Sequence, residues 1–437
     1  MTDFLWKKGS EPDLNPRAMR FLAGRDVILD REILPFDIRA TKAHAAGLER
    51  IGILEPEDAE AIRSSLDELA AAVRAGEFTL DERYEDSHSA IETWLTDRVG
   101  ERGKRIHAGR SRNDQIAVAM RLYLRDRLDL LSDVCTRIAR TCLESAESQV
   151  NVPMPGHTHL QRAMPSSLGL WSAGHAESFL DTAELAYVVR TWLNASPLGT
   201  ASGFGVNLPL DREGVAEELG FRRLVLNPQC AQNSRGKAEL RALDVLGAAT
   251  GDLRRLAWDL SLYASQEFGY VRVGEEFCTG SSIMPNKTNP DTVELLRSVH
   301  STVVGARTEL DAMLALPSGY HRDLQGTKGP VLNAFGVALE GLDLVPDLLR
   351  SLRWDEERLR SGVTGDLHAT DRANERVAGG ESFRAAYRAV ADNLDELTGL
   401  EPEESLAARV STGAAGNLCL DRLWERLHEL GRGGGLE

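Results

Sequence analysis

The segment GSSIMPNKTNP occupies residues 280–290 and combines hydroxyl, amide and ammonium side chains. Asn289 and Pro290 form a favourable helix start, with the asparagine as cap and the proline at the first helical position. Lys287 adds a positive charge just before that helix. A hydroxyl such as that of Ser281, placed beside these groups, suits removal of a proton next to a carboxylate, because the resulting negative charge is stabilised. A polar turn between two helices is the simpler interpretation, but it does not explain the whole combination.

Residues 107–115, HAGRSRNDQ, place two arginines at a predicted helix start. Ser111 followed by Asp114 is a capping-box pattern, so a long helix is expected to begin there. The unpaired N–H groups and the macrodipole of a helix start, together with Arg110 and Arg112, form a ready carboxylate site. An ordinary capped helix with solvated arginines is the alternative.

Two further segments carry polar side chains suited to catalysis or binding. Residues 157–162, HTHLQR, include His159, which can act as a general acid or base because imidazole titrates near neutral pH. A structural histidine is the alternative, and no metal is expected because no third ligand stands at a recognisable spacing. Residues 316–328, LPSGYHRDLQGTK, supply donors for a multiply charged ligand, although a surface loop can contain the same residues.

Long helices are the elements that must position these segments. Apolar residues recur at spacings of three and four, which predicts three amphipathic helices of roughly 25 to 35 residues around residues 124–142, 246–260 and 296–313. A fourth helix is expected over about 166–193, and strand-like alternation is limited to short stretches near 221–226 and 269–273. Helices of this length pack side by side in a bundle. The predicted fold class is all-α.

Changes in these patterns predict three domains. A central long-helix bundle domain is expected over residues 111–362, with a helical domain of shorter helices at 1–110, including 56–75. A small helical domain follows at 363–437, and it ends in a glycine-rich tail at 431–435.

Composition narrows the classes of function. The chain of 437 residues has a formal net charge of −16, which disfavours nucleic acid and anionic membranes as partners. An anionic substrate would therefore need a local cluster of positive groups. The five cysteines show no CxxC pair, which is typical of reduced thiols in cytosol. The N-terminus lacks the apolar run of a signal peptide, and the uncharged stretch at 191–210 is broken by glycine and proline, so a cytoplasmic location is expected.

Together these segments resemble the fumarase/aspartase superfamily and, within it, the argininosuccinate lyase family. The superfamily pattern GSSxMPxKxNP matches without a gap, while HAGRSRNDQ, THLQRA and LPSGYHRDLQ resemble the argininosuccinate lyase branch. The resemblance implies a homotetramer with a central helical bundle, active sites shared between three subunits, and no metal or organic cofactor. It implies reversible cleavage of argininosuccinate to arginine and fumarate in arginine biosynthesis. Another fumarate-releasing lyase, acting on adenylosuccinate or an N-acylated argininosuccinate, and a non-catalytic crystallin-like relative are the alternatives.

The resemblance also implies roles for individual residues. Ser281 removes the Cβ proton of the succinyl group, and Lys287 stabilises the aci-carboxylate intermediate. His159, paired with Glu294, protonates the departing guanidino nitrogen directly or through water, and the direction of reaction decides which of Ser281 and His159 is called the base. Because a serine hydroxyl is a weak acid, Lys287 and helix N–H groups must stabilise its alkoxide. The substrate's carboxylates and amino group are held by seven residues: Arg112, Asn113, Thr158, Asn289, Tyr320, Gln325 and Lys328. His88, supported by Asp86, lies near the site.

The chain departs from the family pattern at several positions. The usual Trp-Gly-Gly-Arg-Phe opening is Leu-Trp-Lys-Lys-Gly at residues 5–9. Asp26 stands at the position of a substrate-binding serine, where it can bind an amino group but would repel a carboxylate. The remaining departures alter the walls of the site: His157, Asn286, Thr288, and Ser234, Gly236 and Lys237 around Arg235.

Overall fold

Helices dominate the computed structural model, which describes residues 15–81 and 83–431. The predicted all-α class is confirmed by the long helices, namely α2 (Asp26–Arg50), α6 (Arg112–Ser148), α7 (Leu168–Leu193), α10 (Lys237–Tyr263), α11 (Asp291–Met313) and α12 (Lys328–Ser351). Within the described ranges, no helix combines the length and the apolar character needed to cross a membrane. The unusual opening at residues 5–9 and most of the glycine-rich tail lie outside the described residues.

Burial explains why the apolar spacing predicted these helices well. In α6, Leu128, Leu131 and Ile138 are all 0% exposed, as expected for the inward side of an amphipathic helix.

Helix α11 begins one residue later than predicted, because the carbonyl of Pro290 accepts the first helical hydrogen bond, from the N–H of Glu294, at 3.2 Å. Pro290 is therefore the cap residue of α11.

Two long helices were not predicted. Residues 1–110 were expected to hold shorter helices, yet α2 extends over 25 residues and continues through Pro35. Proline usually breaks a helix because it lacks an N–H and its ring crowds the preceding turn. Helix α12 has 24 residues and also contains a proline, Pro346. In both cases packing of the apolar side chains outweighs the local preference.

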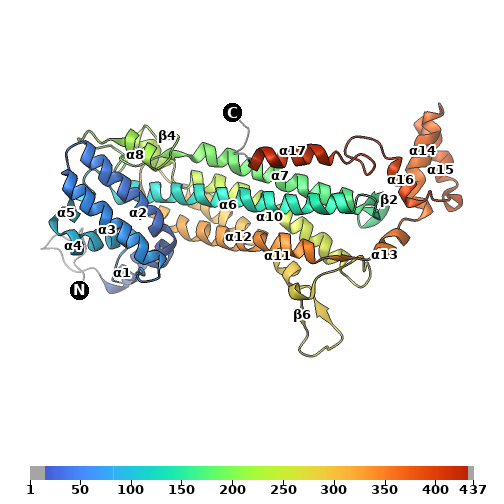
Figure 1. Ribbon diagram of the computed structural model, residues 1–437, viewed down its shortest axis with the longest axis horizontal. Coiled ribbons are helices and arrows are strands. Elements are labelled where there is room, and N and C mark those ends of the chain that lie inside the picture. Colours follow the sequence, from blue (N-terminus) through green and yellow to red (C-terminus); the bar gives the residue numbers. More distant parts are fainter. Residues whose placement is uncertain (1–14, 82, 432–437) are drawn as a thin grey trace. The chain divides into compact units, whose positions relative to one another are not determined.

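The chain divides into two compact units. The first unit comprises Met1–Leu130, Ala186–Val245 and Val303–Gly336. Helices α2, α3 and α4 lie side by side there, around a core that includes Leu48, Leu66 and Leu95 (Figure 1). Its other elements are α1 (Pro16–Ala23), α3 (Pro56–Arg74), α4 (Ser87–Val99), α5 (Glu101–Lys104), η1 (Arg105–His107), β3 (Ala195–Ser196) parallel to β4 (Arg223–Leu224), α8 (Arg212–Glu218), α9 (Pro228–Asn233) and η3 (Arg322–Thr327).

The second unit comprises Leu131–Leu185, Leu246–Thr302 and Val337–Glu437. Its antiparallel strand pairs are β1 (Pro153–Thr158) with β2 (Gln161–Ser167), β5 (Val271–Arg272) with β8 (Arg353–Trp354), and β6 (Thr279–Gly280) with β7 (Thr288–Asn289). The β6–β7 hairpin stands away from the helices of this unit (Figure 1). The remaining elements are η2 (Glu275–Phe277), α13 (Glu356–Ser361), η4 (Gly365–His368), α14 (Ala369–Ala378), α15 (Phe383–Ala391), η5 (Leu394–Glu396), α16 (Pro402–Ala407) and α17 (Leu420–Gly431).

The small strands match the sequence expectations only in part. Strands β4 and β5 confirm the strand-like stretches near residues 221–226 and 269–273. The β1–β2 hairpin was not predicted, although it contains the 157–162 segment. The three-domain division stays a prediction.

Candidate active site

A polar pocket of about 190 Å³ lies within the first unit, where the starts of α2, α4, α6 and α12 meet. Half of the predicted site residues line it: His88, Arg112, Asn113, Tyr320, Gln325 and Lys328. These residues lie far apart in the sequence, so the fold of this unit brings them together. We refer to this cavity as the polar pocket.

Lys328 is held in the polar pocket by two carboxylates of α2. Asp26 and Asp30 are four residues apart and therefore lie on the same side of the helix. Lys328 Nζ lies 3.0 Å from Asp26 Oδ1 and donates a hydrogen bond to Asp30. Burial alone would lower the pKa of Lys328, which is only 5% exposed, but the carboxylates of Asp30 and Asp26 outweigh burial and raise it. Lys328 is therefore charged, and its charge is matched locally.

His88 forms a second buried ion pair. Its Nδ1 lies 2.6 Å from Asp37 Oδ2, and the Ser87 hydroxyl donates to the same oxygen at 2.8 Å. Burial lowers the pKa of His88, but the carboxylates of Asp37, Asp86 and Asp30 raise it by more. The pair is fixed because α4 begins here, with the side chain of Asp86 capping the helix.

Arg112 lies at the start of α6, as predicted. One half of the predicted capping box is present, because the N–H of Ser111 donates to Asp114 Oδ1 at 2.9 Å, while Ser111 Oγ accepts from the N–H of Asn113 and not from that of Asp114. Arg112 Nη1 lies 3.0 Å from Glu85 Oε1 and 3.3 Å from a carboxylate oxygen of Asp86.

The expectation that Arg110 joins Arg112 in binding a carboxylate is wrong. Arg110 points into the protein interior, where its Nη1 donates to Thr41 Oγ1 at 2.9 Å. Its side chain is buried and does not line the polar pocket. Arg110 precedes α6 and lies two residues before Arg112, so the geometry of the helix does not direct the two side chains to the same side.

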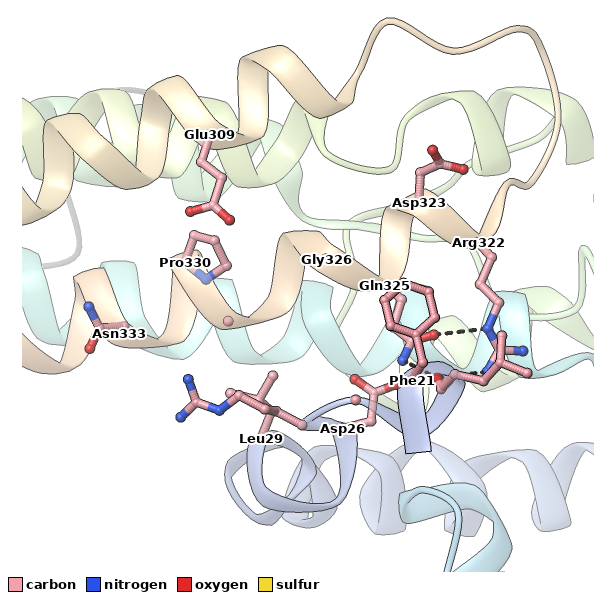
Figure 2. A pocket seen from close by; sticks show the side chains of 14 residues that line it. Phe21, Asp26, Leu29, Glu309, Arg322, Asp323, Gln325, Gly326, Pro330 and Asn333 are labelled. Atoms are coloured by element: carbon pink, nitrogen blue, oxygen red, sulfur yellow. Dashed lines mark hydrogen bonds between the residues drawn. The ribbon is translucent and has the colours of Figure 1, made fainter. Parts of the chain in front are cut away.

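Gln325 connects the polar pocket to the end of α1. Its Nε2 donates to the carbonyl of Leu22 at 2.9 Å, and its Oε1 accepts from Arg322 Nε at 3.1 Å (Figure 2). A larger neighbouring cavity of about 880 Å³ shares a wall with the polar pocket. Asp26, Arg322 and Gln325 belong to this shared wall. Figure 2 shows that larger cavity. Gln325 is the one predicted site residue that lines it, so the polar pocket is the better candidate for the substrate.

Thr158 and His159 lie at the tip of the β1–β2 hairpin in the second unit. Thr158 pairs with Gln161, so His159 and Leu160 form a two-residue turn. Both turn residues have positive φ, +54° and +58°, as the tight turns of hairpins require. Non-glycine residues rarely adopt this conformation, and such strain concentrates at functional sites. Next to this turn, His157 packs on aromatic rings, with its ring centroid 5.5 Å from that of Phe268.

Ser281 opens the loop that joins β6 to β7. Its Oγ accepts hydrogen bonds from the N–H groups of Met284, at 3.0 Å, and Ile283, at 3.4 Å. We expected the N–H groups that stabilise this oxygen to come from the following helix. They come from the loop itself. The same two donors would stabilise a negative charge on Oγ.

Lys287, Asn289 and Glu294 follow Ser281 along the same segment. Lys287 is exposed on the loop, Asn289 lies in β7, and Glu294 lies in the first turn of α11. The Glu294 carboxylate lies 3.8 Å from Arg297 Nη2. Among the described residues, no hydrogen bond or ion pair joins Glu294 to His159, so that pairing stays a prediction.

Some residues of the site were not predicted from the sequence. Asp30, Asp37 and Glu85 supply the carboxylates that fix Lys328, His88 and Arg112. Asp30 and Asp37 are seven residues, about two turns, apart on the buried side of α2, and such buried acidic residues indicate buried cations nearby. Recognising them required α2 to be seen as one helix. Within the described ranges, no group of His, Cys, Asp and Glu side chains is arranged to hold a metal ion.

Comparison with known proteins places the chain in a family. A family described as lyase matches residues 18–305. Similar solved structures include an EDDS lyase in complex with formate, with a TM-score of 0.79, 22% identity and coverage of 97% of this chain and 93% of that chain. A class II fumarase from Schistosoma mansoni has a TM-score of 0.72 and 15% identity, covering 88% of this chain and 94% of that chain. At these identities the structures show the fold alone, while the family match places the chain in the fumarase/aspartase superfamily.

Curated relatives narrow the class further. Argininosuccinate lyases of Xanthomonas oryzae pv. oryzae and Stenotrophomonas maltophilia are each 51% identical over 431 residues, which is 98% of this chain and 100% of theirs. The chain belongs to the argininosuccinate lyase family. It is a carbon–nitrogen lyase by that membership, and the resemblance found in its motifs is confirmed.

Proposed function

We propose that this protein cleaves argininosuccinate reversibly into arginine and fumarate, as the last step of arginine biosynthesis. The observation that carries the proposal is the 51% identity to argininosuccinate lyases over 98% of the chain. This identity favours argininosuccinate over adenylosuccinate or an N-acylated substrate. It also favours an enzyme over a crystallin-like relative, because Ser281, His159, Lys287 and Glu294 are all present.

Ser281 acts as the base in the proposed elimination. Its Oγ takes the Cβ proton of the succinyl group, and the electron pair moves into the adjacent carboxylate to form an aci-carboxylate. The N–H groups of Ile283 and Met284 support an alkoxide at Oγ, and Lys287 adds positive charge near the dianion. Return of the electron pair forms the double bond of fumarate and breaks the carbon–nitrogen bond. The leaving guanidino nitrogen takes a proton from His159, which Glu294 supports.

The remaining groups bind the substrate and require no metal or organic cofactor. The polar pocket presents both signs of charge, with Asp26 beside Lys328 and Asp86 beside Arg112. Such a surface suits a ligand that carries an ammonium as well as carboxylates. The other proposed binding residues are Asn113, Thr158, Asn289, Tyr320 and Gln325, with His88 beside them.

We propose further that four copies assemble and that three of them contribute to each active site. At about 190 Å³ the polar pocket is smaller than a typical small-molecule site of ~300–1,000 Å³, as expected when one chain supplies only part of the site. Long helices also expose large apolar side chains, including Trp192 (39% exposed), Trp258 (50%) and Leu295 (68%). Such residues mark interfaces between copies. We propose a cytoplasmic location and keep the domain limits 1–110, 111–362 and 363–437.

Product analysis tests the proposed function. Purified protein incubated with argininosuccinate should release arginine and fumarate in equal amounts, measured by chromatography. Adenylosuccinate should remain intact under the same conditions. Cleavage of adenylosuccinate, with argininosuccinate untouched, would reject the proposed substrate.

A further inference from the structure

Arg235 is a buried cation with unused hydrogen-bond donors. It lines the polar pocket but is only 7% exposed. Neither Nε nor Nη1 has a hydrogen-bond partner among the described residues. The carboxylate of Glu239 lies 3.8 Å from Nε, which is beyond hydrogen-bond distance. Buried donors are rarely left unpaired in proteins, because they lose their hydration on folding and gain nothing in return.

The charge around Arg235 is also unbalanced. Glu239 interacts electrostatically with Arg121 as well, so two buried arginines share one carboxylate. Arg121 uses its donors within the protein, on the carbonyl of Leu193 and the hydroxyl of Ser234. One positive charge of these two arginines therefore remains to be matched, and it is Arg235 that lines the polar pocket with open donors. An unmatched buried charge is costly, and an anion that enters the pocket would relieve that cost.

Two other cations of the polar pocket already have acidic partners. Lys328 contacts Asp26 and Asp30, and Arg112 contacts two carboxylates of the α4 start. An incoming carboxylate meets competition at both positions. At Arg235 it meets open donors instead.

The backbone holds Arg235 at this position. It lies in the short joint between α9 and α10, where its N–H donates to the carbonyl of Gln232 at 3.1 Å. The next residue, Gly236, has a φ of +78°, and a Cβ there would lie 2.2 Å from a methyl carbon of Leu314. Glycine suits this turn best because of its positive φ, and the turn fixes the backbone next to Arg235.

We propose that Arg235 is a substrate-binding residue whose open N–H groups receive a carboxylate of argininosuccinate. This inference rests on the proposed function. A guanidinium suits the role because its planar fork can donate two parallel hydrogen bonds to one carboxylate. The carboxylate belongs either to the succinyl half, which becomes fumarate, or to the arginine half, and the two products distinguish these cases.

Three variants test the proposal: Arg235→Gln, Arg235→Lys and, as a control, Arg125→Gln. Arg125 is buried to a similar degree, but it donates to Asn194 Oδ1 and to carbonyls and does not line the pocket. Arg235→Gln should raise KM for argininosuccinate at least about tenfold, the loss expected for a charge-assisted hydrogen bond. Arg235→Lys should raise it less, because the charge is kept. Arg125→Gln should lower Tm without changing KM.

Binding without turnover gives a second measurement. Fumarate or arginine should raise the Tm of the wild-type protein, and the product whose carboxylate meets Arg235 should lose this effect in Arg235→Gln. An unchanged KM together with unchanged Tm shifts overturns the proposal. If Arg235→Gln does not fold, the same unchanged results in Arg235→Lys overturn it. If the wild-type protein does not cleave argininosuccinate, the proposed function fails, while the Tm shifts still decide whether Arg235 binds a carboxylate.

Discussion

The ammonium of Lys328 lies 3.0 Å from the carboxylate of Asp26, although Asp30 already neutralises it. Two carboxylates on one cation leave an excess negative charge at this end of the polar pocket. Burial raises the pKa of Asp26, while the charge of Lys328 opposes this effect. A substrate ammonium would restore the balance. Asp26, which replaces the serine usual in the family, is therefore suited to bind the amino group of the substrate.

Replacing Asp26 tests this assignment. Asp26→Asn should raise KM for argininosuccinate at least about threefold and leave kcat almost unchanged, because the contact is made equally in the ground and transition states. Initial rates over a range of substrate concentrations measure both constants. A lower KM would show instead that Asp26 opposes binding by weakening Lys328.

The strained tip of the β1–β2 hairpin should respond to glycine. Leu160 is 66% exposed and has a φ of +58°, so Leu160→Gly loses little buried surface and relieves the strain. We expect the free energy of unfolding to rise by up to about 1 kcal/mol, since strain relief exceeds the entropy cost of glycine. Leu226→Gly provides the control, because Leu226 is 76% exposed and its φ is not positive.

Urea unfolding measures the contrast. Leu226→Gly should lower the free energy of unfolding, because no strain is relieved there. If Leu160→Gly destabilises the protein as much as Leu226→Gly does, the turn conformation carries no strain. Turnover should fall in Leu160→Gly, because the neighbouring His159 loses its fixed position.

The ion pair of His88 and Asp37 should make stability depend on pH. The pKa of His88 is raised above its ordinary value of 6.5 by carboxylates that outweigh burial, so the folded state binds the proton more tightly than the unfolded state. The stabilisation is complete below pH 6.5 and is lost as pH rises through the raised pKa. The pKa of Asp37 is lowered, since His88 outweighs burial, so its contribution is lost as pH falls below 3.8. The free energy of unfolding of the wild-type protein should exceed that of His88→Gln by the largest amount between pH 3.8 and pH 6.5.

His107 should make the free energy of unfolding change with pH in the opposite direction. Although His107 is exposed to solvent, partial desolvation and the nearby charge of Arg110 lower its pKa to about 4, so the folded state resists protonation. Relative to His107→Gln, the wild-type protein should lose stability as pH falls from 6.5 towards 4. Denaturant unfolding at several pH values measures both variants. Parallel pH profiles for His88→Gln and His107→Gln would contradict the ion pair of His88.

Mixing two inactive variants tests the shared active site. Arg112 lies in the first unit and Ser281 in the second, so Arg112→Gln and Ser281→Ala damage different parts of the proposed site. If each site draws these residues from different copies, tetramers refolded from a mixture should contain some intact sites. Activity well above that of either parent is expected. No recovery from properly assembled mixed tetramers would place both residues in the same copy.

The sequence predicted the long helices better than the small elements that position the site. The stripe through Leu128, Leu131 and Ile138 is a local signal, because one helix face repeats every three or four residues. The β1–β2 hairpin has no such signal. Its turn residues are histidine and leucine, whereas the usual turn residues are asparagine and glycine. The positive φ of His159 is therefore not visible in the residue types of the turn.

The motifs predicted which residues line the polar pocket but not how their charges are matched. Lys328, Arg112 and His88 were identified, whereas Asp30 and Asp37 were not. Their importance depends on packing between α2 and segments about 50 to 300 residues away, as in the Ser87 and Lys328 contacts of Asp30. Such distant pairing cannot be read from periodicity. Arg235 likewise became informative only through its burial and its unused donors.

Fumarate release, followed by its ultraviolet absorbance, tests the central claim most directly when wild type is compared with Ser281→Ala. Ser298→Ala serves as the control, since Ser298 is an exposed residue of α11 whose hydroxyl donates to the carbonyl of Leu295 within the same helix. Wild type and Ser298→Ala should release fumarate from argininosuccinate at similar rates. Ser281→Ala should be slower by at least about a thousandfold, because the group that takes the proton is removed. Near wild-type turnover in Ser281→Ala would contradict Ser281 as the base, and no fumarate from the wild-type protein would contradict the proposed function.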